Sequence, residues 1–521
     1  MKTIFSKKSQ RKNLCILLCL FMMLSLFSGC NGKQTPGEDI DVDNSYESSG
    51  NTENSGDESL NSDDPDNTTG SNSTNTTGSN GTNSTGSNST KSSNSNKTNI
   101  ENPFSPNLGG KTITIAYVSS NLFNKTKDGS SKYNDAVADR TAKLEKELNC
   151  KIVTKESPTK EALREAIFNT AMSGGKYADI LMAQEHQFSS YMTNKLLVDL
   201  NTVSTLDLSK DYMNSGNVLN ANRFGNKNYG LIIREMMLDY SVGIFFNKKL
   251  LKPGMANPYD LVKNKEWTVS KMREMMKAVQ TPNATDASGT WGMLAYDPNY
   301  FGMAMLAASG TSLVKNNNGN ISYNTDSKEV MDAINLGNQI YQKDKTLLQQ
   351  PETNCIRMFT EGRALFFTSY TYYVQKLTAM SDDFGYLPFP RTDKVSDIRS
   401  NIDHNASMLG ILTGGDISSA GVVLQALCYE SEKTTLKVKN SDFTVRYFRD
   451  SDSGKMLEKV NDSISLTPDS VVCAQPDNGP IEWGTIAVLY RGVAGDDPSA
   501  LVAETKDAAI ASLKEWLKKV S

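Results

Sequence analysis

The sequence predicts an α/β protein with two lobes, each a mostly parallel sheet flanked by helices, behind a long segment that cannot form a core. Three observations lead to this prediction. From Lys111 onwards, apolar stretches typical of strands alternate with apolar residues at helical spacing. The region from there to Ser521 has about 410 residues, more than one hydrophobic core usually supports. Residues 31–107 are mostly Ser, Asn, Thr, Gly and Asp, a composition expected to stay disordered.

The N-terminus has the features of an export signal. Basic residues from Lys2 to Lys12 precede an apolar run, residues 14–27, that is too short to span a bilayer as a stable helix. The run ends in Leu26-Phe-Ser-Gly-Cys30, which resembles the lipobox of bacterial lipoproteins. That resemblance implies cleavage before Cys30 and attachment of lipid to its sulfur; the alternative is an ordinary signal peptide with an incidental cysteine. We assign residues 1–29 to a lipoprotein signal peptide and 30–107 to a lipid-anchored, disordered tether.

Charge and cysteine content exclude several classes of protein. The chain has 55 basic and 59 acidic residues, and five of the basic ones precede Cys30, which leaves 50 against 59 in the mature part. Such an acidic balance argues against a nucleic-acid partner. The four cysteines after Cys30 are far apart in the sequence, so we expect buried free thiols and neither a disulfide framework nor a metal cluster. They are Cys150, Cys355, Cys428 and Cys473.

Strand and helix alternate at the start of the ordered region. Residues 111–118, 151–155 and 178–183 have the apolar pattern of strands, and the last is apolar enough to be buried on both faces. Between them, residues 133–148 have helical spacing, and Thr159 can cap a second helix that ends at Gly174-Gly175. This order predicts a parallel sheet with helices on both sides.

The second part of the chain begins with an unusually long apolar stretch, residues 238–250, which we expect to cross between lobes. Helices are predicted at residues 269–279, 330–341, 354–361, 418–429 and 498–519, with a glycine- and aromatic-rich stretch at 289–310. Residues 384–390 are extended and bounded by proline, and residues 407–413 are an apolar strand.

Several local motifs occur in an order typical of one family. Besides Cys30 they are Tyr177-Ala-Asp-Ile-Leu-Met-Ala183, Ile244-Phe-Phe-Asn-Lys-Lys-Leu250, Phe359-Thr-Glu-Gly-Arg-Ala-Leu-Phe366 and Pro388. In this order they resemble the extracellular solute-binding proteins of family 1, the receptors of sugar-type ABC importers. Phe246 stands where the family usually has Tyr, and Leu365 where it usually has Met.

The resemblance implies a two-lobed fold of the periplasmic-binding-protein type II class. Residues 108–238 and 384–430 would form the N-terminal lobe, and residues 239–383 and 431–521 the C-terminal lobe. The protein would be a monomeric, lipid-anchored receptor on the outer face of a Gram-positive cytoplasmic membrane, without cofactor or catalysis. It would deliver a carbohydrate to the permease subunits of an ABC transporter. The long C-terminal region, with Tyr447-Phe-Arg-Asp450 and Glu482-Trp-Gly484, resembles a subgroup whose ligands include oligosaccharides.

The candidate ligand contacts follow from a general rule and from sugar chemistry. In open parallel sheets, ligands lie outside the carboxyl ends of the strands, which selects Ser119, Ser120 and Asn121 after one strand and Gln184, Glu185 and His186 after another. Sugars have apolar C–H faces and a rim of hydroxyls, so aromatic planes are expected beside polar groups. The aromatic candidates are Trp291, Tyr296, Tyr300, Tyr370, Tyr372, Tyr373 and Trp483.

From these we predict ligand contacts at Asn121, Glu185, His186, Trp291, Tyr370, Tyr372 and Trp483. Alternatives remain for several of them: Glu185 could be a solvated loop carboxylate, either tryptophan could be core, and one of Tyr372 and Tyr373 could be structural. Because the contacts come from both lobes, binding should close the cleft by a hinge at residues 238–246.

Two other classes of function are considered. An exported enzyme acting on glycans would use paired carboxylates, but nothing in the sequence marks such a pair, and His-Glu-x-x-His, Gly-x-Ser-x-Gly and Walker-type motifs are absent. A calcium loop at Asp450-Ser-Asp-Ser-Gly454 lacks the glutamate at its twelfth position, where Asn461 stands. A surface binding protein without a transport role fits the anchor, but an adhesin would be built of β-rich modules.

Overall fold

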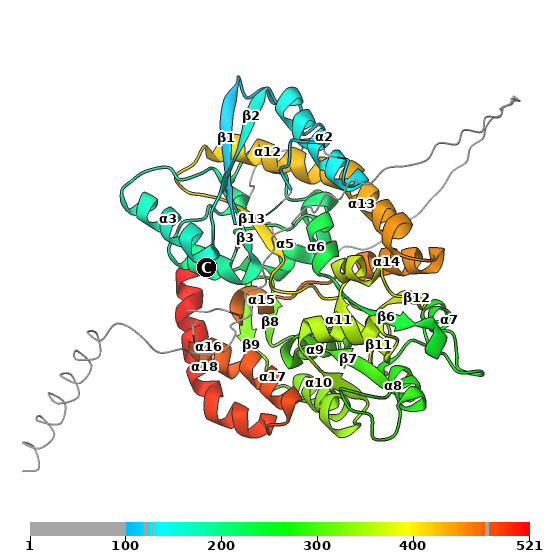
Figure 1. The fold of residues 1–521 in the computed structure, drawn as a ribbon. Coiled ribbons are helices and arrows are strands. Elements are labelled where there is room, and N and C mark those ends of the chain that lie inside the picture. Colours follow the sequence, from blue (N-terminus) through cyan, green and yellow to red (C-terminus); the bar gives the residue numbers. More distant parts are fainter. Residues whose placement is uncertain (1–99, 119, 121, 128, 475–478) are drawn as a thin grey trace, which may run out of the picture. The chain divides into compact units, whose positions relative to one another are not determined.

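The computed structural model describes residues 100–118, 120, 122–127, 129–474 and 479–521 (Figure 1). The predicted signal peptide, Cys30 and the tether up to residue 99 lie outside the described residues. The described part contains two larger sheets, each flanked by helices, so the two-lobed α/β prediction is confirmed.

The first lobe is built on a sheet of strand order β13-β3-β1-β2. The three predicted N-terminal strands are confirmed, and β1 runs parallel to both β2 and β3. The fourth strand, β13, is antiparallel to β3. These strands are β1 (Lys111–Tyr117), β2 (Cys150–Glu156), β3 (Ile180–Gln184) and β13 (Ser407–Ile411).

The first-lobe helices begin where side chains can cap them. Ser131 and Thr159 each accept a hydrogen bond from the backbone amide three residues further on, which satisfies an N–H group that the helix itself leaves unpaired. The second helix stops before Gly174, whose φ of +74° suits glycine. The helices are α2 (Lys132–Glu147), α3 (Lys160–Met172), α4 (Phe188–Thr193), α5 (Val218–Ala221), α6 (Arg234–Tyr240) and α12 (Ile417–Glu430).

The second lobe is built on a sheet of strand order β10-β7-β11-β6-β12. Strands β7, β10 and β11 are parallel, whereas β6 is antiparallel to both of its neighbours, β11 and β12. The strands are β6 (Val242–Asn247), β7 (Trp291–Ala295), β10 (Leu347–Gln349), β11 (Ala364–Tyr370) and β12 (Phe384–Pro388).

The prediction that residues 238–250 form one long crossing is wrong in its extent. Only Ser241 lies between α6 and β6, and β6 is an interior strand with all six residues buried. Its neighbours approach closely, since a Cβ on Gly243 would lie 2.3 Å from the Tyr386 hydroxyl oxygen. A strand paired on both sides cannot act as a hinge, so the predicted hinge at residues 238–246 shrinks to its first few residues.

The lobe boundary predicted at residue 384 is also wrong. Strand β12 pairs with β6 and therefore belongs to the second sheet, and the chain returns to the first sheet only at β13. An extended segment with proline at its end does not reveal its partner strand, which the register with β6 decides.

Three second-lobe helices, α8, α10 and α11, agree with the predicted ones to within a few residues, whereas α7 was not predicted. The glycine- and aromatic-rich stretch resolves into β7 and α9, and Asp297 caps α9 by accepting from two backbone amides. The helices are α7 (Pro258–Lys263), α8 (Val269–Val279), α9 (Pro298–Ala308), α10 (Lys328–Asn338) and α11 (Glu352–Thr360).

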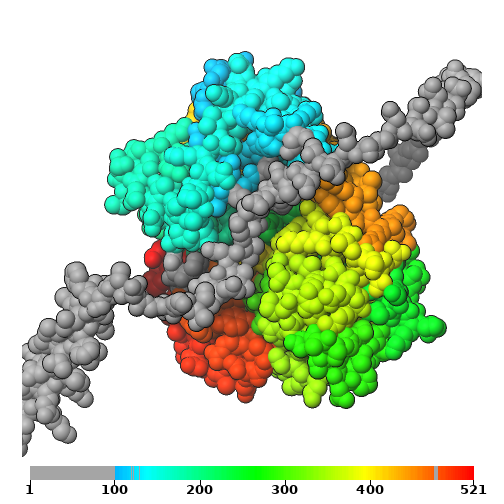
Figure 2. All heavy atoms as spheres, in the orientation of Figure 1, coloured from blue at the N-terminus to red at the C-terminus, as the bar shows by residue number. Residues whose placement is uncertain are grey.

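The C-terminal region does not belong wholly to the second lobe, as was predicted for residues 431–521. Helix α13 packs on α2 of the first lobe and α14 packs on β12 of the second. The orange part of the chain in Figure 2 accordingly lies between the cyan first lobe and the yellow and green second lobe. Helix α18 packs on α16 and α17 and ends against α4 of the first lobe. The helices are α13 (Leu436–Asp442), α14 (Ser451–Ser463), α15 (Asp469–Val472), α16 (Gly479–Gly484), α17 (Ile486–Ala494) and α18 (Pro498–Val520).

The cysteines behave as predicted. All four in the described part are free thiols; Cys355, Cys428 and Cys473 are buried and Cys150 is half-buried. Over the same described residues, no helix is both long and apolar enough to cross a membrane.

Candidate functional site

Three chain segments cross between the lobes and lie side by side. The Ser241 backbone pairs with Ile402, and the Ser400 backbone pairs with Ile464. The Asp403 amide also donates to the Tyr240 carbonyl at 3.0 Å. Together with the bond from the Glu185 amide to the Ala406 carbonyl, they place the ends of α6 and β3 and the segment before β13 around one junction. The rule for open sheets expects a ligand there.

The first-lobe side of this junction is the turn after β3, where Glu185 is buried with 1% of its surface exposed. Its Oε1 accepts from the Asn222 side chain at 3.2 Å, and its amide donates to the Ala406 carbonyl. Burial raises the pKa of Glu185 to about 7, and although the Asn222 bond lowers it, the negative charges of Asp403 and Asp469 add to the rise. Glu185 is therefore a buried carboxyl with a mixed protonation state near neutral pH rather than a solvated one.

His186 lies beside a second histidine that the sequence did not single out. Its Nδ1 is 3.2 Å from the His404 carbonyl oxygen, and the two rings meet edge to face at 5.2 Å. Burial lowers the pKa of His186 to about 4, so the imidazole is neutral. His404 is itself 3.5 Å from the Asp403 carboxylate.

The second-lobe side is a set of tyrosines, which we call the tyrosine cluster. Tyr296 follows β7, Tyr370 ends β11, and their hydroxyl oxygens are 2.7 Å apart. The rings of Tyr300 and Tyr370 meet edge to face at 4.9 Å, and those of Tyr370 and Tyr372 stack at 5.7 Å. Further members are Tyr240 and Tyr373.

The tyrosine cluster stands next to Asp403, whose amide donates to the Tyr240 carbonyl. Burial raises the pKa of Tyr296, and the nearby Asp403 charge raises it further, so this hydroxyl stays protonated. The same two causes raise the pKa of Tyr370. Asp403 also lines one small pocket together with Tyr300. The arrangement combines aromatic rings, hydroxyl groups and a carboxylate; Tyr300, Tyr370 and Tyr373 are buried, whereas Tyr240, Tyr296 and Tyr372 are half-buried. The described residues contain no cluster of His, Cys, Asp and Glu that could hold a metal ion.

The structure does not bring the two tryptophans into this cluster. Trp291 is the first residue of β7, at the opposite end of the strand from Tyr296, and its indole N–H donates to the Thr285 carbonyl. Trp483 lies on α16, is 52% exposed, and forms no described ring contact with the tyrosines. Asn121 lies outside the described residues, whereas Ser120 accepts from the Leu122 amide.

Sequence reasoning missed Tyr240, Asp403, His404 and Asn222. Tyr240 precedes β6, and the amino end of an antiparallel strand lies at the same sheet edge as the carboxyl ends of its neighbours. The strand direction was therefore the missing information. Asp403 and His404 sit in an irregular crossing segment that has no periodic pattern to reveal its place.

A large hollow adjoins the junction. It has a volume of about 1360 Å³, and its lining includes Arg164, His186 and Asn194 of the first lobe and Lys514 and Trp516 of α18. Small-molecule sites usually occupy roughly 300–1,000 Å³, so the hollow is large enough for a solute of several rings.

Comparison with known proteins identifies the family. The sequence matches the family model of the bacterial extracellular solute-binding proteins over residues 124–417, which is more than half of the chain. The chain belongs to this family. A search of curated sequences gives no match.

Solved structures of several sugar-binding proteins share the fold. The sugar-binding protein MalE from Xanthomonas citri has a TM-score of 0.56 at 14% identity, covering 79% of this chain and 100% of that one. The extracellular solute-binding protein from Staphylococcus aureus, solved with maltose, has a TM-score of 0.55 at 16% identity, covering 78% and 98%. The GacH receptor of Streptomyces glaucescens, solved without ligand and with acarbose, has a TM-score of 0.51 at 16% identity, covering 78% and 99%.

Proposed function

We propose that this family member is a lipid-anchored receptor that captures a carbohydrate, most suitably an oligosaccharide, between its lobes and delivers it to the permease of an ABC importer. The observation that carries the proposal is the tyrosine cluster beside Asp403. Tyrosine rings pack against the C–H faces of a sugar, and the hydroxyls and carboxylate hydrogen-bond to its rim. His186 and the adjoining hollow extend the site towards α18.

The relatives of similar fold support the choice of ligand class. The Staphylococcus aureus protein was solved with maltose, the Streptomyces glaucescens receptor with acarbose, and a cyclo/maltodextrin-binding protein with maltotetraose. At this level of identity the likeness concerns the fold, so the sugar itself has to be tested on this chain.

The anchor and the partner rest on the sequence. A lipid on Cys30 would hold the receptor at the outer membrane surface, and the tether would let the lobes reach the permease. We expect a Cys30→Ser chain to leave the membrane fraction or to stay unprocessed. Unchanged labelling by a radioactive fatty acid would contradict the anchor.

Thermal unfolding of the full-length Cys30→Ser chain tests the ligand class. Maltose, maltotetraose and acarbose would be compared with tetra-alanine as a control solute. A ligand at 100 times its dissociation constant stabilises the native state by about 2.7 kcal/mol, which raises the melting temperature measurably. A shift with saccharides alone supports the proposal, whereas a shift with the peptide alone contradicts it.

The same samples separate the receptor from an exported enzyme acting on glycans. After overnight incubation, chromatography should recover each saccharide unchanged. Appearance of shorter saccharides would favour the enzyme. If the purified chain binds a saccharide without cleaving it, uptake of that saccharide is compared in cells with and without the chain. Equal uptake would favour a surface binding protein without a transport role.

A further inference from the structure

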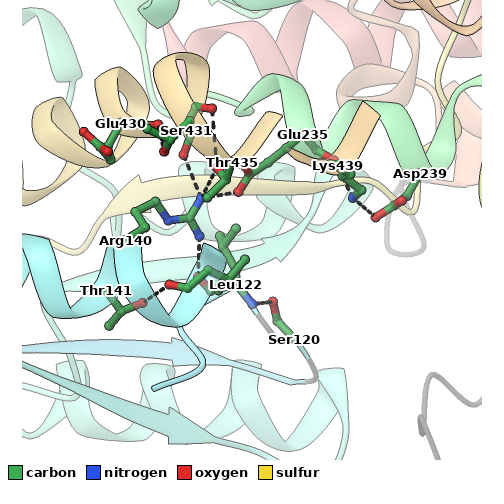
Figure 3. A network of polar contacts seen from close by, with 12 residues as sticks. Ser120, Leu122, Arg140, Thr141, Glu235, Asp239, Glu430, Ser431, Thr435 and Lys439 are labelled. Atoms are coloured by element: carbon green, nitrogen blue, oxygen red, sulfur yellow. Dashed lines mark hydrogen bonds and ion pairs between the residues drawn. The ribbon is translucent and has the colours of Figure 1, made fainter. Parts of the chain in front are cut away.

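A buried polar network lies behind the candidate site and is centred on Arg140 of α2 (Figure 3). The side chains of Arg140 and Glu235 are both fully buried and form an ion pair. Arg140 also donates to Ser431 Oγ at 2.9 Å and to Thr435 Oγ1 at 3.0 Å. One guanidinium therefore joins α2, α6 and the helical segment Ser431–Thr435.

The network also holds the loop that follows β1. Arg140 Nη2 donates to the Leu122 carbonyl at 2.6 Å, and the Leu122 amide donates to Ser120 Oγ at 3.0 Å. The Leu122 backbone is thus held at both its N–H and its C=O group. This loop leaves the carboxyl end of β1, the sheet edge at which a ligand is expected.

On its other side the network contacts α6 close to Tyr240, a member of the tyrosine cluster. Lys439 Nζ donates to the Glu235 carbonyl at 2.7 Å and pairs with Asp239. Glu235 and Asp239 are four residues apart, so both contacts lie on one face of α6. The next residue is Tyr240, whose ring lies 6.1 Å from the rings of both Tyr370 and Tyr372.

The chemistry of the network suits positioning better than stability. Two buried charges cost desolvation, and a well-packed apolar pair of similar volume is often as stable. A guanidinium, however, has donors in a rigid planar fork, so it fixes the direction of several partners at once, which an apolar side chain or an ammonium group does not.

We propose that Arg140 is a positioning residue of the solute site: it holds the loop after β1 and the end of α6 in one arrangement, so that Ser120 and Tyr240 face the same solute. The test of this role by saccharide affinity rests on the proposed function. Arg140 itself does not touch the solute, because its side chain is fully buried.

The test removes both charges together, so that neither is left unpaired. The Arg140→Met/Glu235→Leu chain should fold, since Lys439 keeps Asp239 and Thr435 can still donate to the Ser431 carbonyl. The matched control is Arg273→Met/Asp344→Leu, a two-bond ion pair between α8 and the segment before β10. That pair lies at the amino-terminal edge of the second sheet, away from the tyrosine cluster.

Two measurements are made on the wild type and both double variants: the dissociation constant for maltotetraose by calorimetry, and amide hydrogen exchange by mass spectrometry. We expect the Arg140 variant to bind maltotetraose roughly tenfold more weakly, because the loop after β1 and the end of α6 lose the side chain that fixes their positions. Exchange should become faster at residues 122–127 and 236–241 in this variant alone.

The outcomes distinguish this inference from the proposed function. Wild-type affinity and wild-type exchange in a cooperatively folding Arg140 variant would overturn the positioning role. If the wild type does not bind maltotetraose, the choice of ligand fails, and the exchange data alone decide the role of Arg140. If the Arg140 variant does not fold, Arg140→Lys replaces it, and unchanged exchange at both segments then overturns the inference.

Discussion

Two of the places where the described parts of the lobes meet differ in what holds them. At the crossing, made of residues 240–242, 400–403 and 463–465, backbone hydrogen bonds join three neighbouring segments. At the second place, which we call the rim, side chains and the end of α18 make most of the contact, and a backbone bond from the Gly225 amide to the Gly319 carbonyl at 2.9 Å joins the two hairpins. The rim comprises the hairpin of β4 (Arg223–Phe224) and β5 (Lys227–Asn228), the hairpin of β8 (Val314–Asn317) and β9 (Asn320–Tyr323), and the end of α18.

The rim contacts are few and specific. Asn316 Nδ2 donates to the carbonyls of three first-lobe residues, Asn220, Ala221 and Arg223, at 2.8 to 3.0 Å. The Trp516 indole N–H donates to Ser189 Oγ at 2.7 Å, and its ring meets Phe224 edge to face at 5.2 Å.

The comparison indicates which contacts can part when the lobes move. Covalent crossings persist in every arrangement of the lobes, whereas side-chain contacts can break as a unit. We therefore expect the rim to oppose opening and the crossing to act as the pivot. Solute affinity then depends on the rim, because a ligand shifts the two arrangements only by its difference in affinity for them.

The largest effect is expected for Trp516→Ala. The side chain is buried with 3% exposed, so its removal should cost about 3 to 5 kcal/mol of the free energy of unfolding. The rim should also open, which small-angle scattering would detect as a larger radius of gyration. Trp516→Phe is the control: it loses the bond to Ser189 but keeps a ring against Phe224. An unchanged radius of gyration in Trp516→Ala would contradict the role of the rim.

A pH effect is expected next, at Glu185 beside the crossing. The folded pKa of Glu185 is about 7 and lies above the ordinary value of 4.5, so the carboxyl is protonated more readily in the folded chain. Below pH 4.5 the carboxyl is protonated in both states and does not lower the free energy of unfolding. From pH 4.5 to pH 7 it lowers the free energy of unfolding progressively, and above pH 7 by a constant amount. A shift of this size corresponds to about 3 kcal/mol.

Glu185→Gln removes this cost. The difference in unfolding free energy between Glu185→Gln and the wild type should therefore grow in favour of the variant from pH 4.5 to pH 7. Urea titrations at several pH values measure it, and taking the difference removes the opposite trend caused by His186, whose folded pKa is lowered. A difference that does not vary with pH would show that Glu185 is ionised throughout.

The sequence predicted the sheets better than the junction between them, for physical reasons. Periodic apolar residues predict strands and helices, and β1, β3 and α8 begin and end within two residues of their predicted bounds. Partner and direction are long-range properties, so the places of β6 and β12 were wrong. The predicted site residues were least accurate where they depended on strand partner and direction. Tyr370 and Tyr372 do lie in the tyrosine cluster, but Trp291 lies at the far end of its strand.

A smaller effect is expected for Gly319→Ala. Gly319 has a φ of +94°, and a Cβ there would lie 1.7 Å from the Gly225 carbonyl oxygen across the rim. The hairpins must separate, at about 2 to 3 kcal/mol. Gly254→Ala is a matched control, since Gly254 has a φ of +84° with nothing within 4 Å, and it should cost only about 1 kcal/mol. Equal losses in the two variants would show that backbone strain alone matters.

Asn316→Ala should cost about 2 kcal/mol, because three carbonyls lose their donor. Unlike the glycine variant it introduces no clash, so stopped-flow kinetics of saccharide binding become informative. If the rim opposes opening, the association rate should change while the second-lobe site keeps its structure. The control is Asn354→Ala on α11, which removes one hydrogen bond from the Asn354 side chain to Gln350. It should leave the association rate unaltered.

The smallest effect is expected at the crossing, for Ser241→Ala. Ser241 Oγ donates to the Leu238 carbonyl at 2.8 Å and is 2.7 Å from Thr371 Oγ1. Its loss should cost about 1 kcal/mol, since Thr371 can still donate to the Ser241 carbonyl. The backbone pairing with Ile402 does not depend on the side chain, so the radius of gyration and the saccharide affinity should match the wild type. If Ser241→Ala instead opened the lobes as far as Trp516→Ala, the crossing would be a clamp rather than a pivot, and the distinction between the two meeting places would be lost.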